Sequence, residues 1–353
     1  MLAEPLRRGN CRPEQPRLTL LLCTLLSIAL ASVRTASSSH DTAPQEESEF
    51  SLKVNVDLVL LNLTVVDENG RSVTGLRQDD FSLYENGILQ TITEFLPTEA
   101  PFNLALVLDT SSSVRPSLHL IKKAGVEFAQ QLRTKDRIGI EVFNSSVTQL
   151  QGFTSDRKQL TRTLNGLSVS TFGGSKVYDA IAQAVYRLRE LSTGRSAIVI
   201  LSDGMENASR IKFDGLRLLL AQSDAVLYPV TILNRQRQQD QLEAYIRSRP
   251  ESDPYLANAR ASLAVLSEIY QLQTDRLSSL AQETGGKVFV VANLSDLAGE
   301  YAKIAEQLRN TYSVAYYSTN SRRDASLRSV RIEMKNPKYQ VRGRTTYFVP
   351  KEE

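Results

Sequence analysis

The chain has 353 residues, with 42 Lys and Arg against 39 Asp and Glu, so its formal net charge is +3 at pH 7. Charges this close to balance do not indicate a nucleic-acid-binding protein, which commonly carries a basic stripe. The only two cysteines, Cys11 and Cys23, lie near the N-terminus. The body of the chain therefore lacks the ligands of a Cys/His zinc site, and its length is enough for two domains of about 150 residues each.

The N-terminus has the pattern of a secretory signal peptide over 1–31. Four arginines precede a short apolar run that ends in the small-x-small site Ala29-Leu30-Ala31. The run is shorter than the roughly 20 residues of a membrane span. We expect cleavage after Ala31, with Ala36 as second choice and an uncleaved anchor as the alternative. The protein would then be exported, periplasmic or extracellular, without a membrane span. Residues 32–49 predict a flexible linker.

The next part of the chain predicts a small antiparallel β domain over 50–98. Asn-Gly turns at 69–70 and 86–87 separate segments with strand-like patterns. We expect the strands 52–66, 81–84 and 89–95 to pair in order as a meander.

From Asn103 onward, buried strands alternate with helices. Continuous apolar runs are typical of strands covered on both faces, and helices between them imply βαβ units. The fold class is therefore α/β, with a doubly wound, mostly parallel sheet and flanking antiparallel β-sandwich segments. The expected strands are 104–108, 138–143, 197–201, 225–233 and 287–292, and the expected helices are 119–132, 177–191, 213–222 and 294–308.

Two regions depart from this alternation. Residues 235–273 are polar and then helical, and they are long for a connection, so we interpret them as an insertion. Residues 311–350 return to β patterns. We expect this C-terminal segment to pack with 50–98 into one β-sandwich, into which the α/β domain over 103–310 is inserted.

Polar side chains follow the buried strands at the edge where open α/β sheets bind ligands. The first strand runs into an Asp-x-Ser-x-Ser loop, a later strand is followed by an Asp, and a Ser precedes the helix between them. Carboxylates, hydroxyls and water are hard oxygen ligands that suit Mg²⁺. The pattern predicts a magnesium site, with Ca²⁺ or Mn²⁺ as alternatives, made by Asp109, Ser111, Ser113, Ser175 and Asp203.

These loops resemble the metal-ion-dependent adhesion site of von Willebrand factor type A domains, and the resemblance covers about 103–310. It implies that the three hydroxyls touch the metal, that the two carboxylates act largely through water, and that a carboxylate of a protein partner completes the shell. Ser175 stands where the family has Thr, which keeps the hydroxyl but leaves its rotamer less restricted. Asp179 matches a further family Asp and would orient the site without binding the metal.

The flanks are similar to those of a bacterial group, the acidobacterial-type von Willebrand factor A-related proteins. The similarity lies in 65–95, in LAQETGGKVF at 280–289 and in LRNTYSVAYY at 308–317. It implies a bacterial source.

The resemblance implies an exported, non-enzymatic adhesion protein that engages an acidic side chain of a protein partner through the metal. Its oligomeric state stays open. One alternative is a structural interaction protein with a vestigial metal site, which binds through its β flanks or the insertion. Another is a metal-dependent hydrolase using Asp109 and Asp203, for which Glu206 is the only nearby acid–base candidate. A third treats Ser111–Ser113 as no more than a helix cap.

Overall fold

A computed structural model describes the fold for residues 58–99, 101–170, 174–191, 193–202, 205–232, 234–291 and 294–351. The predicted signal peptide, the predicted linker, the start of the expected strand 52–66 and Asp203 lie outside these residues. Within the described ranges, no helix is both long and apolar enough to cross a bilayer.

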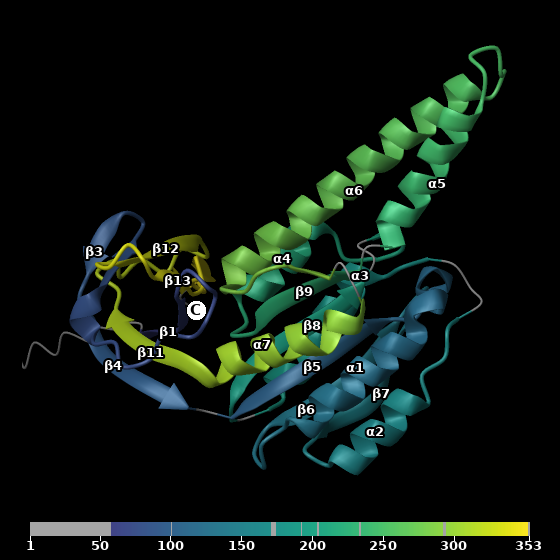
Figure 1. The fold of residues 1–353 in the computed structure, drawn as a ribbon. Coiled ribbons are helices and arrows are strands. Elements are labelled where there is room, and N and C mark those ends of the chain that lie inside the picture. Colours follow the sequence, from purple (N-terminus) through teal and green to yellow (C-terminus); the bar gives the residue numbers. More distant parts are fainter. Residues whose placement is uncertain are drawn as a thin grey trace, which may run out of the picture. The chain divides into compact units, whose positions relative to one another are not determined.

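A six-stranded sheet with the order β10-β9-β8-β5-β6-β7 forms the centre of the α/β part (Figure 1). Five strands are parallel to their neighbours, and β7 is antiparallel at the edge. The predicted doubly wound, mostly parallel sheet is confirmed. The strands are β5 (Phe102–Asp109), β6 (Arg137–Phe143), β7 (Val147–Thr154), β8 (Arg195–Ser202), β9 (Val226–Ile232) and β10 (Phe289–Val291).

Strand β5 is buried along its whole length because helices cover both of its faces. Leu104, Leu106 and Leu108 point into one core cluster, whereas Ala105 and Val107 point into the other. The first cluster includes side chains of α1 (Leu118–Gln130), α2 (Arg157–Asn165) and α7 (Leu297–Arg309). The second includes side chains of α3 (Val177–Arg189), α4 (Phe213–Ala221) and the C-terminal part of α6 (Leu256–Thr284).

The flanking segments form two four-stranded sheets, β13-β1-β11-β4 and β14-β12-β2-β3, which share one hydrophobic cluster. Each sheet contains strands from both ends of the chain, and in β13-β1-β11-β4 they alternate, so the predicted meander of 52–66, 81–84 and 89–95 is wrong. The first strand pairs with β11 and β13 instead of with β2, and β2 and β3 form a local hairpin. The strands are β1 (Leu58–Val66), β2 (Phe81–Glu85), β3 (Ile88–Gln90), β4 (Ile92–Glu99), β11 (Asn310–Tyr317), β12 (Leu327–Met334), β13 (Gln340–Arg342) and β14 (Thr346–Phe348).

A buried ionic network joins the two flanks. Glu85 on β2 accepts hydrogen bonds from the hydroxyls of Tyr316 and Tyr347, each at 2.9 Å, and from Ser318 at 2.8 Å. Arg328 on β12 lies 3.2 Å from the same carboxylate and is itself almost fully buried. A buried charge is stable only when it is paired and hydrogen-bonded, and here the groups that satisfy Glu85 all come from the C-terminal segment.

Three elements differ from the sequence-based expectations. The edge strand β7 carries the mostly polar sequence VTQLQGFT, which has no buried-strand pattern. The short polar helix α2 starts at Asp156, whose side chain accepts from the backbone N–H groups of Lys158 and Gln159. Helix α6 continues beyond 273 to Thr284, because no Gly or Pro interrupts it before Gly285, whose φ is +89°.

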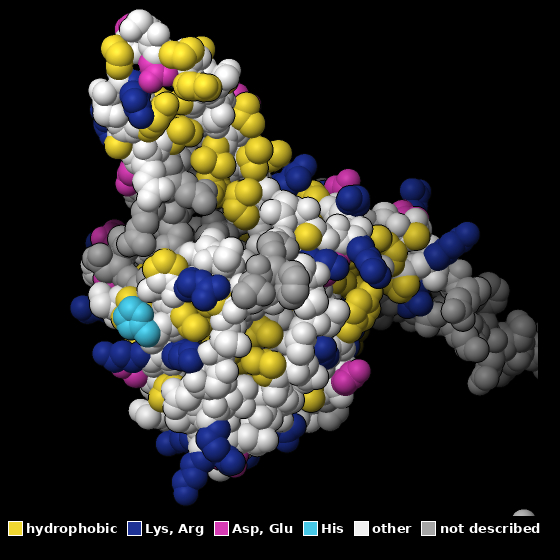
Figure 2. All heavy atoms as spheres, turned by 90° about the vertical axis from the view of Figure 1, so that its right-hand side faces the viewer, with side chains coloured by type: hydrophobic (Ala, Val, Ile, Leu, Met, Phe, Trp, Pro, Cys, Tyr) yellow, Lys and Arg dark blue, Asp and Glu magenta, His cyan; other side chains and the backbone are white. Residues whose placement is uncertain are grey.

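The region interpreted as an insertion contains a helical hairpin made of α5 (Asn234–Ser248) and the first part of α6. Figure 1 shows the hairpin extending away from the sheet. Figure 2 shows hydrophobic side chains gathered along this projecting part. The exposed apolar residues of α6 are Val265, Ile269 and Leu272, and Tyr255 is exposed just before the helix.

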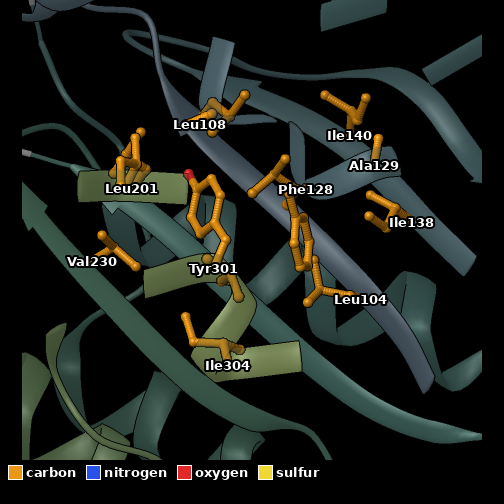
Figure 3. Close-up of a cluster of buried hydrophobic side chains, with 14 of the residues drawn as sticks. Leu104, Leu108, Phe128, Ala129, Ile138, Ile140, Leu201, Val230, Tyr301 and Ile304 are labelled. Carbon is orange, nitrogen blue, oxygen red and sulfur yellow. The ribbon is translucent and has the colours of Figure 1, made fainter. Parts of the chain in front are cut away.

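Tyr301 of α7 fills the core between this helix and the sheet (Figure 3). Its ring lies 5.2 Å from that of Phe128, and its hydroxyl points toward Leu201 in the close-up. The hydroxyl is buried and has no hydrogen-bond partner among the described residues. Burial therefore raises the pKa of the phenol above its usual range, and the unsatisfied group destabilises the fold.

We expect Tyr301→Phe to raise the free energy of unfolding by about 1 kcal/mol, since it removes a buried hydroxyl that gains nothing on folding. Urea denaturation followed by circular dichroism would measure the change. The matched control is Tyr316→Phe, which removes a hydroxyl that donates to Glu85 and should lower stability by about 1–3 kcal/mol. Equal effects of the two substitutions would contradict the assignment.

Candidate metal centre

The loop after β5 holds three of the predicted site residues. The carboxylate of Asp109 is only 1% exposed. Its Oδ1 accepts from the backbone N–H of Ser111 at 2.8 Å, and its Oδ2 accepts from the hydroxyl of Ser202 at 3.3 Å. Leu108 pairs with Leu201 across the parallel strands. The end of β5 therefore meets the end of β8, the strand that precedes Asp203.

The two loop serines bring their hydroxyl oxygens together. Ser111 Oγ and Ser113 Oγ are 2.8 Å apart, because alternate residues of the loop point to the same side while Ser112 is exposed. Ser111 occupies the position before a short 3-10 helix (Ser112–Ser117), yet its side chain makes no capping hydrogen bond. The helix-cap interpretation of Ser111 therefore lacks the contact that it requires.

The spacing of these hydroxyls fits the donor set of a magnesium ion. In an octahedral shell with bonds of about 2.0–2.1 Å, adjacent oxygens lie about 2.9 Å apart. The distance between Ser111 Oγ and Ser113 Oγ is close to that value. Two adjacent corners of such a shell can thus be supplied without moving the loop backbone.

The second loop of the candidate site precedes α3 and holds Ser175, and the third follows β8. Hydrogen bonds join these two loops. The backbone N–H of Ser175 donates to Asn207 Oδ1 at 2.8 Å, and the backbone N–H of Asn207 donates to the carbonyl of Ser175 at 3.2 Å. Gly174 has a φ of +104°, a conformation that side-chain-bearing residues rarely adopt. This reciprocal pair fixes the backbone of Ser175, which is itself buried.

Asn144, at the end of β6, connects the second loop to the first. Its side-chain amide donates to Thr110 Oγ1 at 3.2 Å, and its backbone carbonyl accepts from the backbone N–H of Lys176 at 3.0 Å. The backbone N–H of Thr110 in turn donates to the carbonyl of Phe143. The link from Ser175 to the Asp109 loop thus runs through Asn144 and Thr110.

Asp179 lies in the first turn of α3 and holds the loop that follows β8. Its Oδ1 accepts from the backbone N–H groups of Arg210 at 3.0 Å and Ile211 at 3.1 Å. Lys176 lies 3.7 Å from its other oxygen. These contacts orient the loop that follows β8, and a role of Asp179 at a metal site stays a prediction.

The carboxylate of Glu206 joins the same loop to the start of α3. It accepts from the backbone N–H of Tyr178 at 2.9 Å, from those of Ala208 and Ser209 at 3.1 and 2.9 Å, and from the Ser209 hydroxyl at 2.7 Å. Four donors occupy its oxygens, so its contacts are those of a structural staple. Glu206, the acid–base candidate of the hydrolase alternative, thus has both oxygens hydrogen-bonded to its own loop or to the start of α3.

Sequence reasoning missed Asn144, Asn207 and Gln273. The side chain of Gln273, on α6, accepts from the backbone N–H of Glu206 at 2.6 Å and donates to its carbonyl at 3.0 Å. The projecting hairpin is thereby attached to the third loop. These residues act between segments that are distant in sequence, so no local spacing marks them.

The described residues contain no group of three or more His, Cys, Asp or Glu side chains that could hold a metal ion. A metal at this edge would instead depend on hydroxyl oxygens together with Asp109 and Asp203. The described part of the chain brings Asp109, Ser111 and Ser113 into one cluster, and it joins Ser175 to that cluster indirectly.

Residues 104–206 match the von Willebrand factor type A domain, so the chain contains such a domain. No curated protein matches the chain. Among solved structures, BatB from Bacteroides thetaiotaomicron is 14% identical with a TM-score of 0.41, over 58% of this chain and 98% of BatB. Proximal thread matrix protein 1 from the mussel byssus, with a zinc-occupied MIDAS motif, is 13% identical with a TM-score of 0.44, over 64% of this chain and 50% of that one.

We expect Glu206→Gln to lower the free energy of unfolding by about 1–3 kcal/mol, because it replaces one acceptor oxygen with an NH₂ group and backbone N–H groups then lose their acceptor. Amide hydrogen exchange should speed up at Tyr178 and Ser209. Glu190→Gln, an exposed position at the end of the same helix, is the control and should change neither quantity. Unchanged amide exchange rates in Glu206→Gln would contradict the conclusion that Glu206 links α3 to the loop after β8.

Proposed function

We propose that this chain is an exported, non-enzymatic binding protein whose α/β domain, over about 103–310, engages a protein partner through a divalent metal. Mg²⁺ would be held by Ser111, Ser113 and Ser175, with Asp109 and Asp203 acting largely through water. The bound ion would supply an electrophilic position that an acidic side chain of the partner fills.

The observation that carries this proposal is the pair of serine hydroxyls 2.8 Å apart beside the buried carboxylate of Asp109. A turn that only started a helix would direct Ser111 to the backbone N–H groups of that helix. Here the two hydroxyl oxygens have the separation of neighbouring ligands in an octahedral shell.

The hydrogen bonds between the loops support the same proposal. Hydrogen bonds of Asn144, Asp179, Glu206 and Asn207 join the described loop segments at this edge of the sheet. Such outer contacts orient metal ligands. A rigid set of neutral hydroxyls and few carboxylates leaves the ion electron-poor, which favours binding of an external carboxylate.

Calorimetric titration of the protein with MgCl₂ tests the site. We expect saturable binding in the wild type and at least tenfold weaker binding in Asp109→Ala, because a carboxylate that organises the shell is lost. Ser175→Thr should bind equally or more tightly, since the β-branch restricts the hydroxyl rotamer. Asp275→Ala, which removes an exposed carboxylate on α6, is the control and should bind like the wild type.

The titration is repeated with acetate in excess, so that the oxygen expected from a partner is present. If Mg²⁺ does not bind saturably to the wild type under either condition, the metal proposal is wrong. Circular dichroism of Asp109→Ala and of the milder Asp109→Asn separates loss of the site from loss of the fold.

A second candidate function is a metal-independent interaction through the α5–α6 hairpin. Val265, Ile269 and Leu272 are spaced by four and three residues, so they share one face of α6, and Val265 and Leu272 are 56% and 52% exposed. Contiguous exposed apolar surface is typical of a protein interaction site.

Capture experiments on the organism's extracellular and envelope fractions distinguish the two candidates. If the metal site is used, chelation and Asp109→Ala should abolish capture of the partner, while Leu272→Asp has little effect. If the hairpin is used, chelation should have no effect, while Val265→Asp and Leu272→Asp should each weaken capture at least tenfold.

A further inference from the structure

A cavity of about 430 Å³ lies between the α/β part and the flanking strands. Its wall is formed by the end of α6 and the turn after it, by the middle of β12, and by the segment 341–345. Figure 1 shows the inner end of α6 close to β13. The GGK sequence at 285–287, part of one of the segments similar to the bacterial group, lines this cavity, and the proposed metal site does not involve it.

Close backbone contact shapes the cavity. Gly285 has a φ of +89°, and a side-chain carbon added there would lie 2.7 Å from the carbonyl carbon of Gly343. The backbone N–H of Thr345 donates to the carbonyl of Glu283 at 3.0 Å. Because glycines meet here and a backbone hydrogen bond joins the two walls, the cavity is formed without a ligand.

All charged side chains that line this cavity are positive. Lys287, Arg331, Arg342 and Arg344 all line the cavity, and none of its described lining residues is acidic. Two of the four cations have counter-charges outside it: Arg331 contacts Glu333, and Arg344 lies 3.6 Å from Asp224, whose side chain is 88% exposed.

The other two cations, Lys287 and Arg342, form no ion pair with any described residue. The ammonium of Lys287 lies 4.4 Å from the centre of the Phe289 ring, and burial, followed by the charge of Arg342, lowers the pKa of Lys287. Burial likewise lowers the pKa of the Arg342 guanidinium. Both cations are therefore held partly out of water and near each other.

Arg342 also has an unsatisfied donor. Its Nη1 is buried without a hydrogen-bond partner in the described part of the chain, and its Nη2 reaches only Gln340 Oε1, at 3.4 Å. A buried cationic donor without an acceptor is costly. A guanidinium fork matches the two oxygens of a phosphate or carboxylate.

We propose that this cavity is a binding site for a small oxyanionic molecule, whose phosphate or carboxylate group is held by Lys287 and Arg342. The volume falls in the range of small-molecule sites, about 300–1,000 Å³. An oxyanion would neutralise the like-charge repulsion between the two cations. Because the walls belong to the α/β part and to the flanking strands, a bound anion would also strengthen the contact between them.

Calorimetric titrations of the protein with inorganic pyrophosphate and with citrate, without divalent metal, test the proposal. We expect saturable binding of at least one anion at a single site. Arg342→Gln and Lys287→Gln should each weaken it at least tenfold. Arg260→Gln on α6, which removes a cation paired with Glu251 away from the cavity, should not change it. Binding of pyrophosphate alone would identify a phosphate ligand, and binding of citrate alone a carboxylate ligand.

Thermal unfolding separates an anion site from a structural cation. Without anion, Arg342→Gln should keep or raise the melting temperature, since it removes an unsatisfied charge. With the anion in excess, the wild type should gain stability and Arg342→Gln should not. The proposal is overturned if neither anion binds saturably, or if both cavity variants bind as tightly as the wild type. Arg260→Gln weakening binding to the same extent would also overturn it, because the attraction would then be non-specific.

Discussion

The fold depends on one strand that is buried on both faces. Each residue of β5 lies in the interior, and its parallel pairing with β6 and β8 sets the register of the central sheet. That register brings Asp109 beside Ser202, so the loops that follow β5 and β8 start at the same edge. A shift of the pairing would exchange the two core faces of β5, so the core and the position of the site are specified together.

Composition and spacing are sufficient to predict the parallel strands of the central sheet and the polar cluster after β5, because continuous apolar runs and an alternating loop leave local patterns. The residues that hold the loops together could not be predicted. Asn144, Asn207 and Glu206 act through hydrogen bonds between segments about 30 residues apart, which local spacing does not reveal. The meander failed for the same reason: the partner of β1 is far along the chain, and polar turns alone do not choose a partner.

Two clusters of charge inside the protein differ in how they are satisfied. Around Glu85, the hydroxyls of two tyrosines and a serine, together with Arg328, surround one carboxylate. The described residues that line the cavity with Lys287 and Arg342 include no acid, and a buried donor of Arg342 remains without a partner among the described residues. The hydrogen-bonded ion pair at Glu85 stabilises one arrangement of the strands, and Arg328 Nε is its one buried donor without a partner in the described part of the chain. The cavity cations Lys287 and Arg342 have unused binding capacity, and they lie where the flanking strands meet the α/β part.

The interleaving of the flanking strands has a consequence for the newly made chain. Asn62 on β1 and Ser313 on β11 are partners separated by 251 positions. At about 5–20 residues per second, a ribosome needs about 13–50 seconds to pass from one to the other. During that interval the apolar side of β1 and the edge of β4 stay uncovered, while the α/β part between them has already been synthesised. Such edges invite pairing with other chains, so the early strands are open to mispairing until β11 emerges.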